Sequence, residues 1–193
     1  MADAANGNDS DNNGAHETAI LAGGCFWCVE AVYDDLKAVS RVESGYIGGH
    51  VDNPTYEQVC GKGTGHAEAV KVEFDPGEIS YEEILDIFFH IHDPTTKDRQ
   101  GNDVGPQYRS AIFPLSDGQR AEAEAAIERA KLQWDNPIVT TIEEGKWWPG
   151  ESEHQDYYAR VGNANPYCNF VVGPKVAKFR KEYADKLKPG VAA

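Results

Sequence analysis

A pair of glycines, Gly23 and Gly24, separates a short apolar run from a stretch that favours a helix, and this pair strongly constrains the fold. Residues 18–22 favour a β-strand, and the glycines let the backbone turn tightly into the helix. Cys25 then lies at or near a helix N-terminus, where backbone N–H groups and the helix dipole favour the thiolate. The thiolate is the reactive form, so we predict that Cys25 is a nucleophile.

Two aromatic residues, Phe26 and Trp27, follow Cys25 directly. Their apolar faces can wall a pocket beside the sulfur, which suits an apolar group of a substrate. Two other interpretations remain open: a buried structural cysteine, or a zinc half-site or dithiol pair formed with Cys28. Zinc needs a second ligand pair at short spacing, but Cys60 and Cys168 stand alone. No metal is therefore predicted.

The composition indicates one domain with an acidic surface. The chain has 193 residues, of which 40% are hydrophobic, and its formal net charge is 18 minus 32, or -14. A phosphate backbone is repelled by such a charge, so nucleic acid is not an expected partner. Basic residues gather between residues 175 and 188, but Glu182 and Asp185 dilute them, which is typical of a solvated helix face.

The first 17 residues are polar, contain no Lys or Arg and lack an apolar segment. We expect residues 1–17 to form a disordered tail without a targeting signal, and residues 18–193 to form the catalytic domain. No apolar run approaches the about 18 to 20 residues that cross a bilayer, so no membrane is expected as a partner. Cysteines without a signal peptide indicate a reducing compartment, the cytoplasm, and we expect a monomer.

Strand and helix patterns alternate along the rest of the chain. Strands are predicted at residues 18–22, 41–47, 67–74, 108–114 and 137–142. Helices are predicted at residues 29–36, continuing from a start near Cys25, and at residues 80–91, 116–134, 152–160 and 174–187, with a short helix or turn at residues 55–59. A long polar loop is predicted at residues 95–107, and such a loop is usually functional or disordered.

Two local signals support these assignments. Ser80 followed by Glu83 fits a capping box at a helix start. In the strand at residues 67–74, alternation places Glu68 on the same face as Val70, Val72 and Phe74. The sequence therefore predicts a carboxylate near the start of a core-facing strand face.

Several ordered motifs together resemble the peptide methionine sulfoxide reductase A family, over about residues 18–187. The motifs are Gly24-Cys25-Phe26-Trp27, Asn53-Pro54-Thr55-Tyr56, Thr64-Gly65-His66-Ala67-Glu68-Ala69-Val70, His92-Asp93-Pro94, Gln100-Gly101-Asn102-Asp103, Gln107-Tyr108-Arg109-Ser110, His154-Gln155 and Tyr167-Cys168. The resemblance implies an α+β fold: a single two-layer domain with a ferredoxin-like core and irregular C-terminal segments wrapped over the sheet.

The resemblance also implies an activity. It predicts reduction of methionine sulfoxide, free or in proteins, with specificity for the S epimer at sulfur. Thioredoxin or another dithiol is the expected reductant, and no cofactor is expected. Attack of the Cys25 sulfur on the substrate sulfur requires protonation of the sulfoxide oxygen, because oxide is a very poor leaving group.

The roles of the other site residues follow from their match to the family. Glu68 is expected to donate the proton, provided that its surroundings keep it protonated. Tyr56 and Tyr108 match two hydroxyl donors to the sulfoxide oxygen, so the three groups act like an oxyanion hole. Asp103 matches a residue that holds the substrate's backbone nitrogen, and His154 matches a neighbour of the pocket. Taken alone, each of these residues also fits an ordinary surface, half-buried or turn position.

Attack leaves Cys25 as a sulfenic acid, which a second thiol converts to a disulfide. Cys168 matches the recycling position in the Tyr-Cys motif, and its surroundings are predicted to form a mobile loop. Cys28 is the second candidate for the resolving thiol, because many family members have glycine there and this chain instead has a Cys-x-x-Cys pair. Cys60 is the third candidate, since a buried thiol is expected at the end of its short helix. The alternative function is a thioredoxin-like dithiol-disulfide oxidoreductase that uses Cys25 and Cys28, and a zinc-stabilised binding module is a third possibility.

Overall fold

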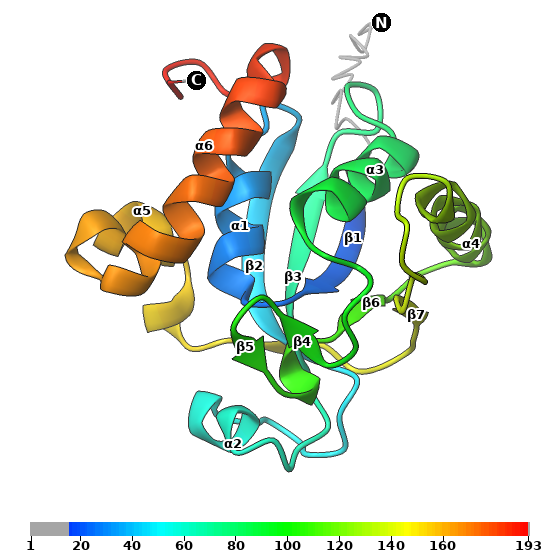
Figure 1. Ribbon diagram of the computed structural model, residues 1–193, viewed down its shortest axis with the longest axis vertical. Helices are drawn as coiled ribbons and strands as arrows, with labels where there is room; N and C mark the ends of the chain where they lie inside the picture. The colour runs from blue at the N-terminus through cyan, green and yellow to red at the C-terminus, as the bar shows by residue number, and fades with distance from the viewer. Residues whose placement is uncertain (1–15, 193) are drawn as a thin grey trace, which may run out of the picture.

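The computed structural model describes residues 16–192 of the chain (Figure 1). Most of the predicted N-terminal tail, up to residue 15, lies outside the described residues. Glu17, the last residue of the predicted tail, begins the first strand. No helix within the described part is both long and apolar enough to cross a membrane.

A six-stranded sheet forms the centre of the molecule. Its strands are β1 (Glu17–Gly23), β2 (Val39–Ile47), β3 (Ala67–Phe74), β6 (Ser110–Ile112), β7 (Thr141–Ile142) and β8 (Trp148–Pro149), in the order β7-β6-β1-β3-β2-β8. Within the four inner strands, β6-β1-β3-β2, each adjacent pair is antiparallel, whereas the edge strand β7 is parallel to β6. Helix α1 (Phe26–Asp34) joins β1 to β2, and α3 (Tyr81–Ile91) follows β3. This order confirms the predicted ferredoxin-like core.

The main helices lie on one face of the sheet (Figure 1). α1 and α3 cover the strands, α4 (Asp117–Lys131) packs against α3, and α6 (Gly173–Glu182) packs against α1. The apolar faces of these elements meet in one large core, in which Leu21, Val70 and Phe88 are fully buried. The capping box predicted from Ser80 and Glu83 is present at the start of α3.

The other face of the sheet carries a smaller apolar cluster. Ile20, Ala67 and Phe113 belong to it, and Trp147 packs against it from the segment between β7 and β8. This segment passes so close to the sheet that a Cβ on Gly145 would lie 2.7 Å from the backbone nitrogen of Gly48. Residues between the two edge strands therefore wrap over the sheet, as predicted.

The structure differs from the predicted elements in the second half of the chain. The predicted loop at residues 95–107 contains a hairpin, β4 (Arg99–Gln100) and β5 (Asp103–Val104), followed by a 3-10 turn, Pro106–Tyr108. Tyr108 therefore lies in a turn and not in the predicted strand. The predicted helix at residues 152–160 is divided into a 3-10 turn, Ser152–His154, and α5 (Tyr157–Val161), because Asp156 between them has a φ of +50°.

Candidate active site

Cys25 is the N-cap residue of α1, as the glycine pair predicts. Gly24 has a φ of +91°, and a Cβ there would lie 2.6 Å from the side chain of Gln100. The Gln100 amide in turn accepts a hydrogen bond from the backbone of Asp93 and donates another to its carbonyl oxygen. Glycine is therefore required for both the turn and the close approach of the β4–β5 hairpin, which forms one side of the site.

The thiols of Cys25 and Cys28 lie close together across the first turn of α1, and each shifts the pKa of the other. Cys25 is only 7% exposed, and this burial raises its pKa well above the ordinary value, although the Tyr167 hydroxyl and the Trp27 N–H act in the opposite direction. The expectation of a thiolate at Cys25 is thus wrong for the free protein, because desolvation outweighs the helix N-terminus. The interaction with Cys25 lowers the pKa of Cys28, and the positive charge of Lys175 lowers it further.

Glu68 lies on β3 directly beside the nucleophile. It is 1% exposed, and its Oε2 accepts a hydrogen bond from the backbone N–H of Phe26 at 3.1 Å. Burial raises the pKa of Glu68 well above its usual range, and the proximity of Cys25 raises it further. Burial therefore favours the protonated carboxyl group, which is the state that a proton donor needs.

Tyr56 and Tyr108 lie near the Glu68 carboxyl group and belong to two different elements. Tyr56 is the first residue of α2 (Tyr56–Cys60), which begins with a capping box, and Tyr108 ends the 3-10 turn before β6. Burial raises the pKa of both phenols, and the nearby Glu68 raises it further. Both hydroxyl groups are therefore neutral and lie near Glu68, although the three residues are far apart in the sequence.

Aromatic rings pack together on one side of Cys25. The Tyr56 and His154 ring centroids are 4.3 Å apart, and the Phe26 and His154 centroids are 5.5 Å apart. Trp27 stacks on Tyr157 at 3.8 Å with an interplanar angle of 8°. Burial lowers the pKa of His154, so this ring is neutral. Phe26, Trp27 and His154 thus contribute to one aromatic cluster, and the sequence analysis missed Tyr157, which carries no recognisable signal of its own.

On another side of Cys25, a cavity of about 240 Å³ opens between the β4–β5 hairpin and the C-terminal segment. It is lined by Cys25, Gln100, Gly101, Asn102, Asp103, Tyr167, Phe170, Val171 and Lys175. The Tyr167 hydroxyl donates a hydrogen bond to Asp103 Oδ2 at 2.6 Å. Asp103 is therefore placed beside the nucleophile, and Tyr167, which the sequence analysis noted only as part of a motif, covers both residues.

The remaining cysteines differ from their predicted surroundings. Cys168 is fully buried and begins a short π-helix, Cys168–Val172, so it does not lie in a loop as predicted. Its side chain lies close enough to Cys25 for the Cys25 charge to raise its pKa, although burial is the larger cause. Cys60 is half-buried beside Tyr56 and not a fully buried thiol.

A scan against protein families matches residues 17–187 to the family described as Peptide methionine sulfoxide reductase. The chain belongs to this family. Its members are thiol-dependent oxidoreductases that reduce methionine sulfoxide, and this function applies to the chain. The match also decides against the thioredoxin-like alternative and against a binding module.

Individual relatives agree with this assignment. The chain is 55% identical over 176 residues to the peptide methionine sulfoxide reductase MsrA of Erwinia tasmaniensis, covering 91% of this chain and 99% of the relative. Mxr1 from Saccharomyces cerevisiae in its reduced form has a TM-score of 0.73 and 34% identity, covering 81% of this chain and 90% of that one. Mxr1 has also been solved in complex with Trx2. That structure has a TM-score of 0.52 and 28% identity, and the match covers 76% of this chain and 87% of that one.

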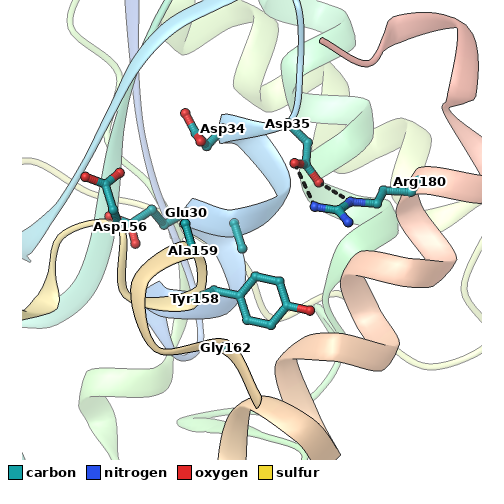
Figure 2. Close-up of a pocket in the computed structure, with 9 residues that line it drawn as sticks. Glu30, Asp34, Asp35, Asp156, Tyr158, Ala159, Gly162 and Arg180 are labelled. Carbon is teal, nitrogen blue, oxygen red and sulfur yellow. Dashed lines mark hydrogen bonds and ion pairs between the residues drawn. The ribbon is translucent and has the colours of Figure 1, made fainter. Parts of the chain in front are cut away.

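A second cavity, of about 320 Å³, lies away from the thiols of this reductase, between α1, α5 and α6 (Figure 2). Asp35 on α1 pairs with Arg180 on α6 there, at 2.8 Å. Glu30 is buried at the end of the cavity, and its carboxylate accepts hydrogen bonds from the Ser44 hydroxyl and from the Tyr157 backbone. Burial raises the pKa of Glu30 to about 7. These contacts attach the C-terminal segment to α1.

Within residues 16–192, no group of three or more His, Cys, Asp and Glu residues is arranged to hold a metal ion.

Proposed function

We propose that this reductase uses Cys25 as its nucleophile and Glu68 as its proton donor. The observation that carries the proposal is the buried Glu68 carboxyl group beside Cys25, because burial favours its protonated form and the two groups supply the two halves of the reaction at one place. The Cys25 sulfur attacks the sulfoxide sulfur while Glu68 protonates the departing oxygen. This step forms a bond between the two sulfurs and releases the oxygen as water. A water then attacks the Cys25 sulfur, which breaks that bond, releases methionine, returns a proton to Glu68 and leaves Cys25 as a sulfenic acid.

Tyr56 and Tyr108 stabilise the negative charge that grows on the sulfoxide oxygen. Both are neutral phenols that share the neighbourhood of Glu68, so each can donate a hydrogen bond to that oxygen. Because donors fixed by the fold need no reorganisation during the reaction, their hydrogen bonds lower the activation barrier.

The aromatic cluster binds the apolar end of the substrate. Phe26 and Trp27 present ring faces beside the sulfur, and His154 completes the wall as a neutral ring. The methyl group of methionine S-sulfoxide fits this environment. Asp103 accepts a hydrogen bond from the substrate's backbone nitrogen, and Tyr167 releases Asp103 when this bond forms.

Two thiols then convert the sulfenic acid to a disulfide. The sequence ranks Cys168 before Cys28, but the closeness of Cys25 and Cys28 in the first turn of α1 leads us to propose the reverse order. The Cys28 thiol attacks the sulfenic acid, a Cys25–Cys28 disulfide forms and water leaves. The Cys168 thiolate then attacks this disulfide, so one new disulfide forms and one thiolate is released.

Thioredoxin or another dithiol completes the cycle by reducing the last disulfide, as the Trx2 complex of a relative suggests. We propose that the protein acts in a reducing, cytoplasmic environment, because Cys25, Cys28, Cys60 and Cys168 are free thiols. We also propose that it acts as a monomer.

Disulfide mapping in a single turnover tests this scheme. The reduced enzyme is mixed with excess methionine sulfoxide without reductant, quenched by acid alkylation after increasing times, and analysed by peptide mass mapping. We expect an early Cys25–Cys28 disulfide that forms together with the first methionine per enzyme, and a later disulfide that contains Cys168. Formation of methionine without oxidation of Cys25 contradicts the nucleophile, and a first disulfide between Cys25 and Cys168 contradicts the proposed order.

A further inference from the structure

The side chain of Phe170 is 83% exposed. Four large hydrophobic side chains are exposed in the described part of the chain, and Phe170 is the aromatic one; the others are Val104, Leu115 and Leu132. Burial of such a ring is favourable by about 25 cal/mol per Å² of apolar surface, and an exposed one is therefore a candidate contact.

The position of Phe170 links it to the reacting thiols. It belongs to the π-helix Cys168–Val172, two residues after buried Cys168, and it lines the cavity that contains Cys25. The opposite wall of this cavity is the β4–β5 hairpin, on which Val104 follows Asp103 and is 53% exposed. Phe170 is thus an exposed apolar side chain at the wall of the cavity that contains the nucleophile.

We propose that Phe170 is the anchor by which the dithiol reductant docks on this enzyme. The inference rests on the proposed function, because that function requires a dithiol partner to reach the disulfide. A relative has been solved with Trx2, and a partner that reduces a disulfide containing Cys168 or Cys28 must approach the helix that carries Phe170. Redox encounters use small interfaces, in which one aromatic contact carries much of the affinity.

The exchange at this surface proceeds in two steps. A thiolate of the partner attacks one sulfur of the enzyme disulfide, which forms a mixed disulfide and releases one enzyme thiolate. The partner's second thiolate then breaks the mixed disulfide, which releases the other enzyme thiolate and leaves the partner oxidised. Lys175 lines the same cavity, and its positive charge favours the thiolate of Cys28, so Cys28 is a good leaving group in this exchange.

The test separates docking from chemistry by changing the reductant. Phe170→Ala is compared with the unmodified enzyme, using free methionine sulfoxide with either thioredoxin or dithiothreitol as reductant. We expect the KM for thioredoxin to rise about tenfold, as for an interface anchor, with unchanged turnover in dithiothreitol. Phe170→Tyr should restore the KM, because it keeps the ring. Leu132→Ala is the matched control, since Leu132 is 88% exposed at the end of α4 and lies outside this cavity.

Three results overturn the proposal. The first is an unchanged KM for thioredoxin in Phe170→Ala, and the second is an equal loss of turnover with dithiothreitol. The third comes from replacing free methionine sulfoxide with an oxidised protein: the KM for that protein rises while the KM for thioredoxin is unchanged. The last result assigns the surface to the substrate chain. Failure of the unmodified enzyme to reduce methionine sulfoxide with dithiothreitol is a different outcome, because it contradicts the proposed function itself and with it any reductant site.

Discussion

Two regions of the molecule supply the active site, and they are held together in different ways. Cys25 and Glu68 lie on α1 and β3, where strand ladders and a closely packed core fix the backbone. The segment at residues 150–172 supplies His154, Tyr167 and Cys168 from short helical turns and no strand. Regular backbone pairing therefore positions the nucleophile and the acid, whereas a loosely built segment carries the cover and a recycling thiol.

A few side-chain anchors attach the C-terminal segment to the sheet region. The Gln155 amide bonds to both backbone groups of Ser44, Glu30 accepts from the Tyr157 backbone, and Tyr167 donates to Asp103. Segments with few backbone ladders open locally at lower free energy than core strands. This difference suits the chemistry, because the first step needs a fixed geometry and the disulfide exchange needs Cys168 to move.

The largest expected effect comes from replacing the nucleophile in the sheet region. Cys25→Ser should abolish sulfoxide reduction with little change in unfolding temperature, because an alcohol is a far weaker nucleophile of nearly the same shape. Methionine formation in a single turnover is the measurement, and Cys60→Ser is the control with a retained rate. Turnover by Cys25→Ser would contradict the assignment.

The second effect tests the acid in the same region. Glu68→Gln keeps the size and the acceptor for the Phe26 N–H but cannot supply a proton, so the single-turnover rate should fall by about 10² to 10⁴. The raised pKa also sets the sign of the pH dependence: the rate in the unmodified enzyme should fall once pH exceeds the pKa of Glu68, when the proton is lost. An unchanged rate in Glu68→Gln removes Glu68 from the acid role.

The third effect tests the anchor between the two regions. The pKa of Glu30 is raised from 4.5 to about 7, so the folded protein keeps a proton that the unfolded chain loses. Stability should therefore fall as pH rises from about 4.5 to about 7, by about 3 kcal/mol. Glu30→Gln should lack this slope in urea unfolding measured across pH 4 to 8, and an identical slope in both proteins contradicts the prediction.

A smaller effect is expected at the cover of the site. Tyr167→Phe removes the hydrogen bond to Asp103 and should increase local opening of the C-terminal segment. The rate at which Cys168 is alkylated under native conditions should rise about tenfold, because a hydrogen bond to a charged group is lost. Tyr157→Phe is the matched control, since its hydroxyl accepts a bond from Asn165 instead. Equal alkylation of Cys168 in Tyr167→Phe and the unmodified protein would show that Tyr167 does not hold the segment.

The smallest effect lies in the sheet region away from the thiols. Ser80→Ala removes the side-chain acceptor of the capping box at the start of α3, which should cost about 1 kcal/mol of stability. Denaturant unfolding measures this loss, and the single-turnover rate should be unchanged. A change in rate without a change in stability would contradict the separation of scaffold and site.

The sequence alone determined what depends on local pattern. Alternation placed Glu68 on the core face of β3, the glycine pair placed Cys25 at the start of α1, and Ser80 with Glu83 marked the start of α3. The ordered motifs determined the family and its ferredoxin-like core, which the strand order confirms. Each of these features is set by contacts between near neighbours in the chain, or by many motifs acting together.

Only the tertiary structure decided what depends on long-range packing. The thiolate predicted at Cys25 is not favoured, because burial by surrounding elements outweighs the helix N-terminus. Cys168 lies in a buried π-helix, and Tyr167 and Tyr157 join the site across more than 60 residues of sequence. Desolvation and contacts between distant segments arise from the packed three-dimensional arrangement, so no short stretch of sequence encodes them.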